Sequence, residues 1–282
     1  MKIDSHTHIP PKMLDLALHS GIANGLGGII ITDYSGVAPF EALQTNRHDR
    51  TPVLHHQHWD IKKTNDPRVL RVDHARDGVQ GTIYVGKGQE VESEKGHILA
   101  LGIEKAIPAG MSWDKTLDAI YEQKGIAVFA HLFGKHSGGC GQKVFEEAWK
   151  RYSGRALGLE ENAQYWNSNT NFQANQLATR LGAPLLFNSD IHGAYSISMF
   201  GRPYVQANLF GKKLYSFFPG VFGSSLFDGM KEVMINRPSS IGRGGEYNAT
   251  METVSWWVDS IRKNGWKKIS GTLKHALKGF KK

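Results

Sequence analysis

The chain has 282 residues, of which 40% are hydrophobic and 21% are charged, and its formal net charge is +8. A chain of this length can bury a large core without cross-links, and its composition is that of a folded globular protein, which excludes disorder as the dominant state. No apolar run approaches the roughly 20 residues of a membrane-spanning helix, and the lone Cys140 excludes an intramolecular disulfide. The first six residues are charged and polar, so we expect no signal peptide. We therefore expect a soluble, cytoplasmic protein without stable membrane insertion. The oligomeric state is left open.

Short apolar segments bounded by Gly, Pro or Asn alternate with amphipathic segments over the first 200 residues. The expected strands are residues 1–5, 28–32, 82–92, 97–103, 126–131, 157–162 and 184–190. The expected helices between them are residues 11–24, 39–47, 113–124, 142–152 and 171–181. Strands that alternate with helices favour a parallel sheet, and this number of units predicts an α/β barrel of the TIM type.

Two regions depart from this alternation. Residues 48–77 contain five histidines among many charges, and we expect them to form an excursion from the barrel. After Gly201 the alternation is lost, and helices are expected over residues 225–236 and 249–264. This pattern predicts a barrel over residues 1–200 and a C-terminal extension over residues 201–282 that packs on the barrel. Residues 266–282 combine an apolar helical stripe with six lysines, which suits packing on the barrel or docking on an anionic surface.

Histidines and carboxylates gather at the ends of the expected strands. His6 and His8 are two residues apart and so face the same side of an extended strand. Because the ends of parallel strands share one rim of a barrel, residues from several strands should meet there. Mixed nitrogen and oxygen ligands favour zinc, manganese or iron. The candidate metal ligands are His6, His8, Glu90, His97, His131, Asp190 and His192.

Some positions near these ligands stay ambiguous. Glu92 faces the same side of its strand as Glu90, so periodicity cannot separate the two. Glu160 and Glu161 end a strand, where they could orient ligands, although we expect a solvated or salt-bridged pair. The alternative for the whole set is that these are buried side chains satisfied by hydrogen bonds alone.

The residues carry a resemblance to a known family. The chain resembles the polymerase and histidinol phosphatase (PHP) family of metal-dependent phosphoesterases, over roughly residues 1–200 and in the family's order. The resemblance implies a distorted (β/α)7 barrel that holds two or three manganese, zinc or iron ions, and it places the seven candidate ligands at family ligand positions. The matching segments are Asp4-Ser5-His6-Thr7-His8, Ile31-Thr32-Asp33, residues 88–93, residues 96–103, Ala130-His131, residues 157–162 and Ser189-Asp190-Ile191-His192.

Two departures from the family pattern concern its third metal. Tyr34 stands where the family has a histidine, and no carboxylate follows closely after His8, since Asp15 falls in an expected helix. We therefore expect two metal ions. The candidate catalytic residues are Asp190, His192 as a phosphate contact or general acid, and Tyr34 as a hydroxyl donor or, alternatively, a packing residue.

The resemblance implies hydrolysis of a phosphate ester by a metal-activated hydroxide, with Glu90 able to bridge two ions. The substrate would be a nucleotide, an oligonucleotide or another small phosphoester, and the basic charge favours nucleotides or nucleic acid as partners. Arg202 and Arg243 are candidate phosphate-binding residues, because the forked guanidinium suits phosphate oxygens. The alternatives are an amidohydrolase-type or deoxyribonuclease-type metal hydrolase and a degenerate, non-catalytic PHP binding module.

Overall fold

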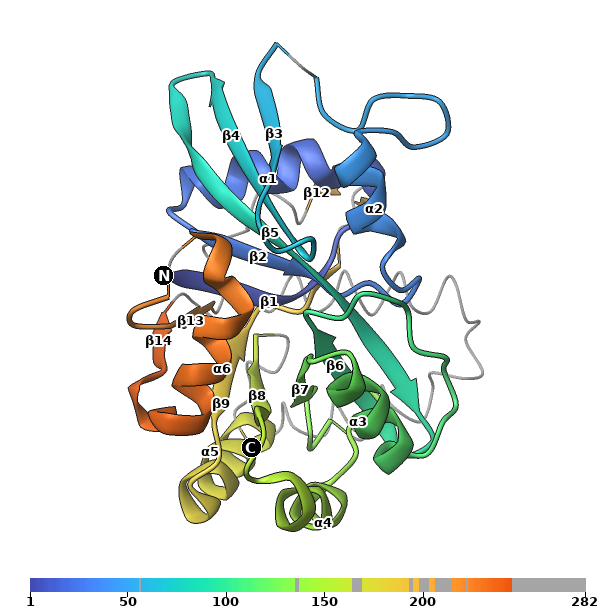
Figure 1. The fold of residues 1–282 in the computed structure, drawn as a ribbon, viewed down its shortest axis with the longest axis vertical. Helices are drawn as coiled ribbons and strands as arrows, with labels where there is room; N and C mark the ends of the chain where they lie inside the picture. The colour runs from blue at the N-terminus through green and yellow to red at the C-terminus, as the bar shows by residue number, and fades with distance from the viewer. Residues whose placement is uncertain are drawn as a thin grey trace.

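The fold is organised around one sheet that curls back on itself (Figure 1). The computed structural model describes residues 1–55, 57–134, 137–163, 169–192, 195–197, 203–205, 215–221 and 223–244. Just after β9, the short strand β10 (Ile191–His192) pairs in parallel with β1 and places His192 opposite His8. The sheet therefore nearly closes, and the expected α/β barrel is confirmed. Its strands follow in the order β1 (Lys2–His8), β2 (Gly28–Ile31), β5 (Val79–Ser93), β6 (Gly96–Leu101), β7 (Ile126–Phe129), β8 (Leu157–Asn162) and β9 (Leu185–Asn188).

Helices cover the outer face of this sheet. In the view of Figure 1, α1 and α2 lie in the upper half of the molecule and α3, α4 and α5 in the lower half. Each apolar helix face packs on outward-facing strand residues, as an amphipathic pattern requires. Among the helices in the described ranges, none is long and apolar enough to span a bilayer. The outer elements are η1 (Pro11–Met13), α1 (Leu14–Ala23), α2 (Ala38–Thr45), α3 (Trp113–Glu122), α4 (Gln142–Tyr152) and α5 (Asn169–Leu181).

Residues from the C-terminal part of the chain fill the interior of the barrel. The helix α6 (Leu226–Asn236) inserts apolar side chains among inward-facing residues of the strands, such as Ile3 and Leu99. A Cβ at Gly102 would lie 2.8 Å from the Phe227 ring, so that glycine leaves room for the helix. Around it lie β13 (Tyr215–Phe217), which pairs antiparallel with β1, β14 (Gly242–Gly244), which pairs with β13, η3 (Gly223–Ser225) and η4 (Pro238–Ser240).

Only part of the C-terminal region covered by the sequence expectations lies within the described residues. The helix expected over residues 225–236 is confirmed as α6. The helix expected over residues 249–264 and the basic segment 266–282 lie outside the described residues. Along the chain, after β10 and before β13, the strands β11 (Tyr195–Ile197) and β12 (Pro203–Val205) form an antiparallel pair.

The expectation of a wholly parallel sheet is wrong on one side of the barrel. β6 runs antiparallel to both β5 and β7. The connection from β5 to β6 consists of residues 94 and 95 alone, whereas a parallel crossover needs a dozen or more residues. The segment 48–77 also holds a hairpin of β3 (Trp59–Lys63) and β4 (Val69–Arg76), which extends the sheet through antiparallel pairing of β4 with β5.

Candidate metal centre

The first strand delivers two imidazoles to the barrel interior because its ladder is irregular. Asp4 pairs with Ile29 of β2, and Thr7 pairs with Ile31, so three steps along β1 match two steps along β2. This bulge shifts the alternation of side chains. Ile3 belongs to the interior core, and His6 faces the same interior three residues later. His8 follows on the same side, and the two Nε2 atoms of His6 and His8 lie 3.1 Å apart.

Glu90 and His97 meet at the rim because β6 is antiparallel. Glu90 lies toward the C-terminal end of β5, and His97 lies at the N-terminal end of β6. In an antiparallel pair these two ends coincide, and His97 Nδ1 lies 2.9 Å from Glu90 Oε1. Glu92 is exposed, so Glu90 is the carboxylate of the site.

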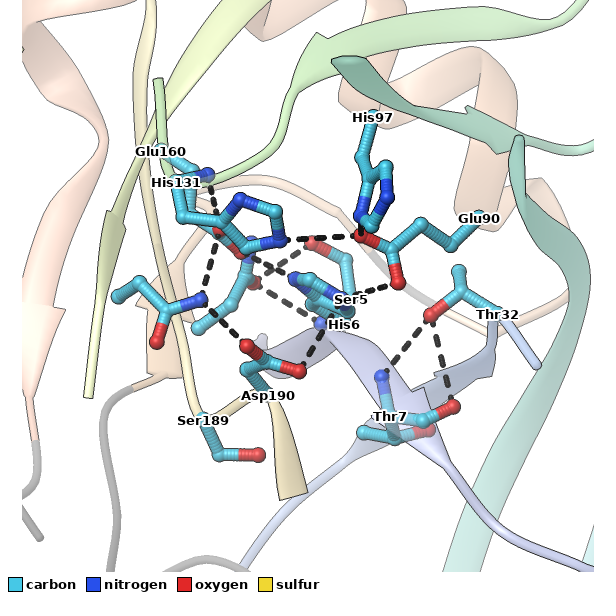
Figure 2. A network of polar contacts seen from close by, with 12 residues as sticks. Ser5, His6, Thr7, Thr32, Glu90, His97, His131, Glu160, Ser189 and Asp190 are labelled. Carbon is cyan, nitrogen blue, oxygen red and sulfur yellow. Dashed lines mark hydrogen bonds and ion pairs between the residues drawn. The ribbon is translucent and has the colours of Figure 1, made fainter. Parts of the chain in front are cut away.

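His131 and Asp190 follow directly after β7 and β9, in backbone conformations that are uncommon for residues with a side chain. His131 has φ 32° and Asp190 has φ 51°. Such left-handed conformations carry a conformational cost, and they gather at sites where a side chain must be aimed. Both side chains turn toward the cluster of His6 and Glu90 (Figure 2).

The two oxygens of Glu90 face two different groups of donors. Oε2 lies 3.4 Å from His6 Nε2 and 3.1 Å from His8 Nε2. Asp190 Oδ1 completes this group, at 3.3 Å from His6 Nε2 and 3.4 Å from His8 Nε2. We call the place where these four side chains converge the first position.

The other oxygen of Glu90 defines a second group. Oε1 lies 2.9 Å from His97 Nδ1 and 3.0 Å from His131 Nε2. We call this place the second position. His6 and His131 also share a set of convergent donor atoms with Glu90, so the two positions are contiguous. The two oxygens of Glu90 therefore face separate clusters of imidazole nitrogens.

Glu160 holds members of the cluster in place through hydrogen bonds. It is 1% exposed, and its Oε1 accepts hydrogen bonds from His6 Nδ1 at 2.7 Å and Asn188 Nδ2 at 3.0 Å. Its Oε2 accepts from the His131 backbone N at 2.9 Å and from Asn162 Nδ2 at 3.0 Å. The expectation of a solvated carboxylate is therefore wrong for Glu160, which is buried, but the expected ion pair is present, with His6 as the partner. Through this pair Glu160 fixes the ring orientation of a candidate ligand.

Asn162 extends this support to the opposite side of the first position. Its Nδ2 also donates to Asp190 Oδ2 at 2.9 Å, which leaves Oδ1 of Asp190 directed at His6 and His8. Asn162 is fully buried at the end of β8. Neither Asn162 nor Asn188 is among the site residues expected from the sequence.

When no ion is bound, the electrostatics of the site lower the pKa values of Glu90 and Glu160 and raise those of His6, His8 and His131. Burial opposes charge at every group, but the charge of His6 and hydrogen bonds from the imidazoles keep the pKa of Glu90 well below its usual range. Burial likewise lowers the pKa of His8, and hydrogen bonds to Asp190 and Glu90 outweigh it and raise that pKa to about 9. Interactions with the same carboxylates outweigh burial at His6 and His131 and raise their pKa values. The cluster therefore has a strong demand for positive charge.

The donor set fits a divalent transition-metal ion. Because His6 Nδ1 donates to the carboxylate of Glu160, its Nε2 presents a lone pair to the first position in the neutral ring. That lone pair would face His8 Nε2 and two carboxylate oxygens, an arrangement of acceptors that a bound cation would satisfy. Imidazole nitrogen with carboxylate oxygen is the ligand mixture of zinc, manganese and iron sites.

Tyr34 lies over the cluster. Its ring stacks on His8, with centroids 4.5 Å apart at 28°, and meets the edge of His97 at 5.7 Å. The residue is 44% exposed, so it stands at the mouth of the site. Burial of its hydroxyl end and the charges of Glu90 and Asp190 raise the pKa of Tyr34, which keeps the phenol protonated.

Other candidate residues lie outside the cluster or outside the described part of the chain. Arg243 lies on β14, and its Nε is 3.0 Å from Glu161 Oε1, so the expected salt bridge is confirmed for Glu161. Asp15 lies in α1 and accepts a hydrogen bond from Trp59 Nε1 at 3.0 Å, away from the cluster, as expected. The His192 backbone pairs with His8, but its side chain lies outside the described part, as does Arg202.

Comparisons with known proteins give likeness of fold alone. No protein-family model matches this chain, and no curated protein matches it. Among solved structures, PsfC from Pseudomonas syringae has a TM-score of 0.53 and 16% sequence identity over 93% of this chain and 98% of that one. The lesion-specific endonuclease PfuEndoQ from Pyrococcus furiosus has a TM-score of 0.49 and 13% identity over 86% of this chain and 56% of that one. The likeness to PsfC extends over nearly the whole of both chains.

Ion binding at this centre is expected to release protons. His8, with its pKa raised to about 9, carries a proton at neutral pH when no ion is bound, and a divalent ion must displace it. The affinity for Zn²⁺ or Mn²⁺ should therefore rise with pH and level off above about 9. The same shift stabilises the ion-free protein below the unfolded-state pKa of about 6.5, and this contribution is lost as the pH rises through about 9. Calorimetric titrations in two buffers of different ionisation enthalpy measure the protons released, and identical apparent enthalpies in both would contradict the prediction.

Proposed function

We propose that this protein is a metal-dependent phosphoesterase of the PHP type. The observation that carries the proposal is Glu90, whose two oxygens face two clusters of imidazoles at one rim of the barrel. His6, His8, Asp190 and Glu90 would hold one ion, and His97, His131 and Glu90 a second. Ions held there would acidify water and neutralise charge on phosphoryl oxygens. The order of the matching segments along the chain supports the family assignment.

Other residues of the chain would orient the ligands or contact the phosphate. Glu160 and Asn162 hold His6 and Asp190 in the orientation in which they face the first position. Tyr34, whose phenol stays protonated, would have to turn its hydroxyl from Glu90 to donate a hydrogen bond to a phosphoryl or leaving-group oxygen. His192 is proposed as a phosphate contact or general acid, from the place of its backbone beside His8. Arg202 and Arg243 are proposed phosphate-binding residues, and Arg243 would have to leave Glu161 to take that role.

The substrate class follows from the same reasoning. Phosphate monoesters and diesters of nucleotides, oligonucleotides or other small molecules all present the anionic oxygens that this centre would bind. The net charge of +8 raises the local concentration of such anions. A small phosphorylated substrate or nucleic acid is therefore the proposed partner.

The deciding experiment combines metal content with hydrolysis. Purified protein should contain about two transition-metal ions per chain and should hydrolyse an aryl phosphate ester. Removing the ions with a chelator should abolish hydrolysis, and adding Mn²⁺, Zn²⁺ or Fe²⁺ back should restore it. Protein that binds ions but never hydrolyses phosphomonoesters, phosphodiesters or oligonucleotides would instead be a binding module. Protein that binds no ion would contradict the metal centre itself.

Replacing Tyr34 by phenylalanine separates its two proposed roles. The variant keeps the ring stacked on His8 and removes only the hydroxyl. If the hydroxyl donates to the reacting phosphate, kcat should fall by about 10²-fold, a typical effect of a positioned proton donor. Metal content should stay at the wild-type value. A kcat equal to that of the wild type would leave Tyr34 as a packing residue.

A further inference from the structure

The loop that follows His131 folds back onto His97. Its described parts are residues 132–134 and 137–141, which lie between β7 and α4. Within the loop, Gly139 N donates to Gly134 O at 2.9 Å, and Gly141 N donates to Leu132 O at 2.9 Å. The loop is joined to β6 by a hydrogen bond of 2.7 Å from His97 N to Gly138 O. One loop therefore begins at one residue of the second position and ends against the other.

At Gly138 the loop touches the imidazole of His97 itself. A Cβ built on Gly138 would lie 2.5 Å from Nε2, 2.6 Å from Cδ2 and 2.8 Å from Cε1 of that ring. These distances are far below van der Waals contact, so with a side chain at residue 138 either the ring or the loop must shift. Gly138 also has φ +81°, a conformation that glycine adopts at little cost.

The opposite side of the same ring is in the candidate metal centre. His97 Nδ1 lies 2.9 Å from Glu90 Oε1, and the side chain is 16% exposed. The His131 ring meets the His97 ring at 5.3 Å between centroids. The imidazole is thus enclosed between the loop at Nε2 and the second position at Nδ1, and its place depends on how closely the loop approaches.

We infer that Gly138 is a positioning residue for the second metal position. The missing side chain at residue 138 lets the His97 ring sit where its Nδ1 reaches the second position beside Glu90 Oε1. The first position takes its donors from β1, β5 and the turn after β9, and none of the described contacts of Gly138 reaches these. The two positions can therefore be perturbed separately. This inference rests on the proposed metal centre.

The test compares two glycines of the same loop. Gly141 has φ +80°, and a Cβ there would meet nothing within 4 Å. Gly138→Ala and Gly141→Ala therefore both place a side chain at a positive φ, and only the first brings a Cβ against His97. We expect Gly138→Ala to bind one of two Mn²⁺ or Co²⁺ ions about 10–100-fold more weakly, as other losses of ligand support do. Gly141→Ala should bind both ions as the wild type does.

Three readouts decide the outcome. Elemental analysis after gel filtration should find one ion per chain in Gly138→Ala and two in the control, with similar melting temperatures. The visible spectrum of the Co²⁺ protein should lose the component that belongs to the second ion. Equal affinities for both ions in the two variants, or an equal loss in both, would overturn the inference.

A failure of the metal centre can be told apart from a failure of this inference. If the wild-type protein binds no ion, the position of the ring is read from the imidazole resonances of His97 by NMR. Gly138→Ala should shift them and Gly141→Ala should leave them in place. Unchanged His97 resonances in Gly138→Ala would overturn the positioning role independently of any metal.

Discussion

Replacing His6 with alanine is expected to reduce hydrolysis of an aryl phosphate ester by at least about 10³-fold, because losing an ion removes several kcal/mol of charge stabilisation. Asp190→Ala should have an effect of the same size. Both side chains face the first position, and their nearest polar atoms are 3.3 Å apart. The fold should persist, because the apolar core that holds the strands together is formed by other residues.

The measurement is kcat/KM together with metal content and a thermal melt. His48→Ala is the matched control, since His48 is a partly exposed histidine that pairs with Asp49 outside the centre. The control should keep wild-type activity and metal content. Turnover near the wild-type rate in either His6→Ala or Asp190→Ala would show that the centre is elsewhere.

Replacing Glu160 with alanine is expected to damage both stability and metal binding. The carboxylate accepts four hydrogen bonds from buried groups, among them His6 and the backbone of His131. Removing one partner of a buried charged pair costs about 3–5 kcal/mol, because the remaining groups stay desolvated. The affinity for the first ion should fall about 10–100-fold, as it does when the support of a ligand is lost.

Urea denaturation and Mn²⁺ titration measure the two effects of Glu160→Ala. Glu160→Gln is the informative companion, because it keeps the shape of the side chain and one oxygen acceptor. It should lose less stability than Glu160→Ala and still weaken ion binding, since an amide cannot draw the proton of His6 Nδ1 as a carboxylate does. A Glu160→Ala variant with wild-type stability and affinity would remove Glu160 from the centre.

The sequence predicted which side chains meet at the rim better than it predicted the strand directions. His6, His8, Glu90, His97, His131 and Asp190 do meet at one rim, as the strand-end argument required. The reason for His97 differs from the one expected, because it starts an antiparallel strand rather than ending a parallel one. The two-residue connection after Ser93 was the available signal, since no parallel crossover fits in it.

Other features of the site could not be predicted from local pattern. Glu160 alternates along β8 with the outward-facing Leu157 and Leu159. This alternation places Glu160 on the inner face of the strand and was the available signal that it is buried. The contact of Asn188 with Glu160 joins two strands through side chains alone, so no sequence periodicity reports it. The bulge in β1 is visible only in the register with β2, because three residues opposite two leave no mark on composition.

The way in which α6 fills the barrel has a consequence for the order of events during synthesis on the ribosome. β1 is made before the other strands of the barrel, yet its inward-facing Ile3 is buried against residues of α6, and its outer edge pairs with β13, more than two hundred residues later. Contacts so distant along the chain form slowly and late. The interior of the barrel is therefore expected to stay open until residues 226–236 have left the exit tunnel. Chaperones that shield apolar surface would then meet a barrel whose interior α6 has not yet filled. The supply of free metal ions would act on the same unfilled barrel.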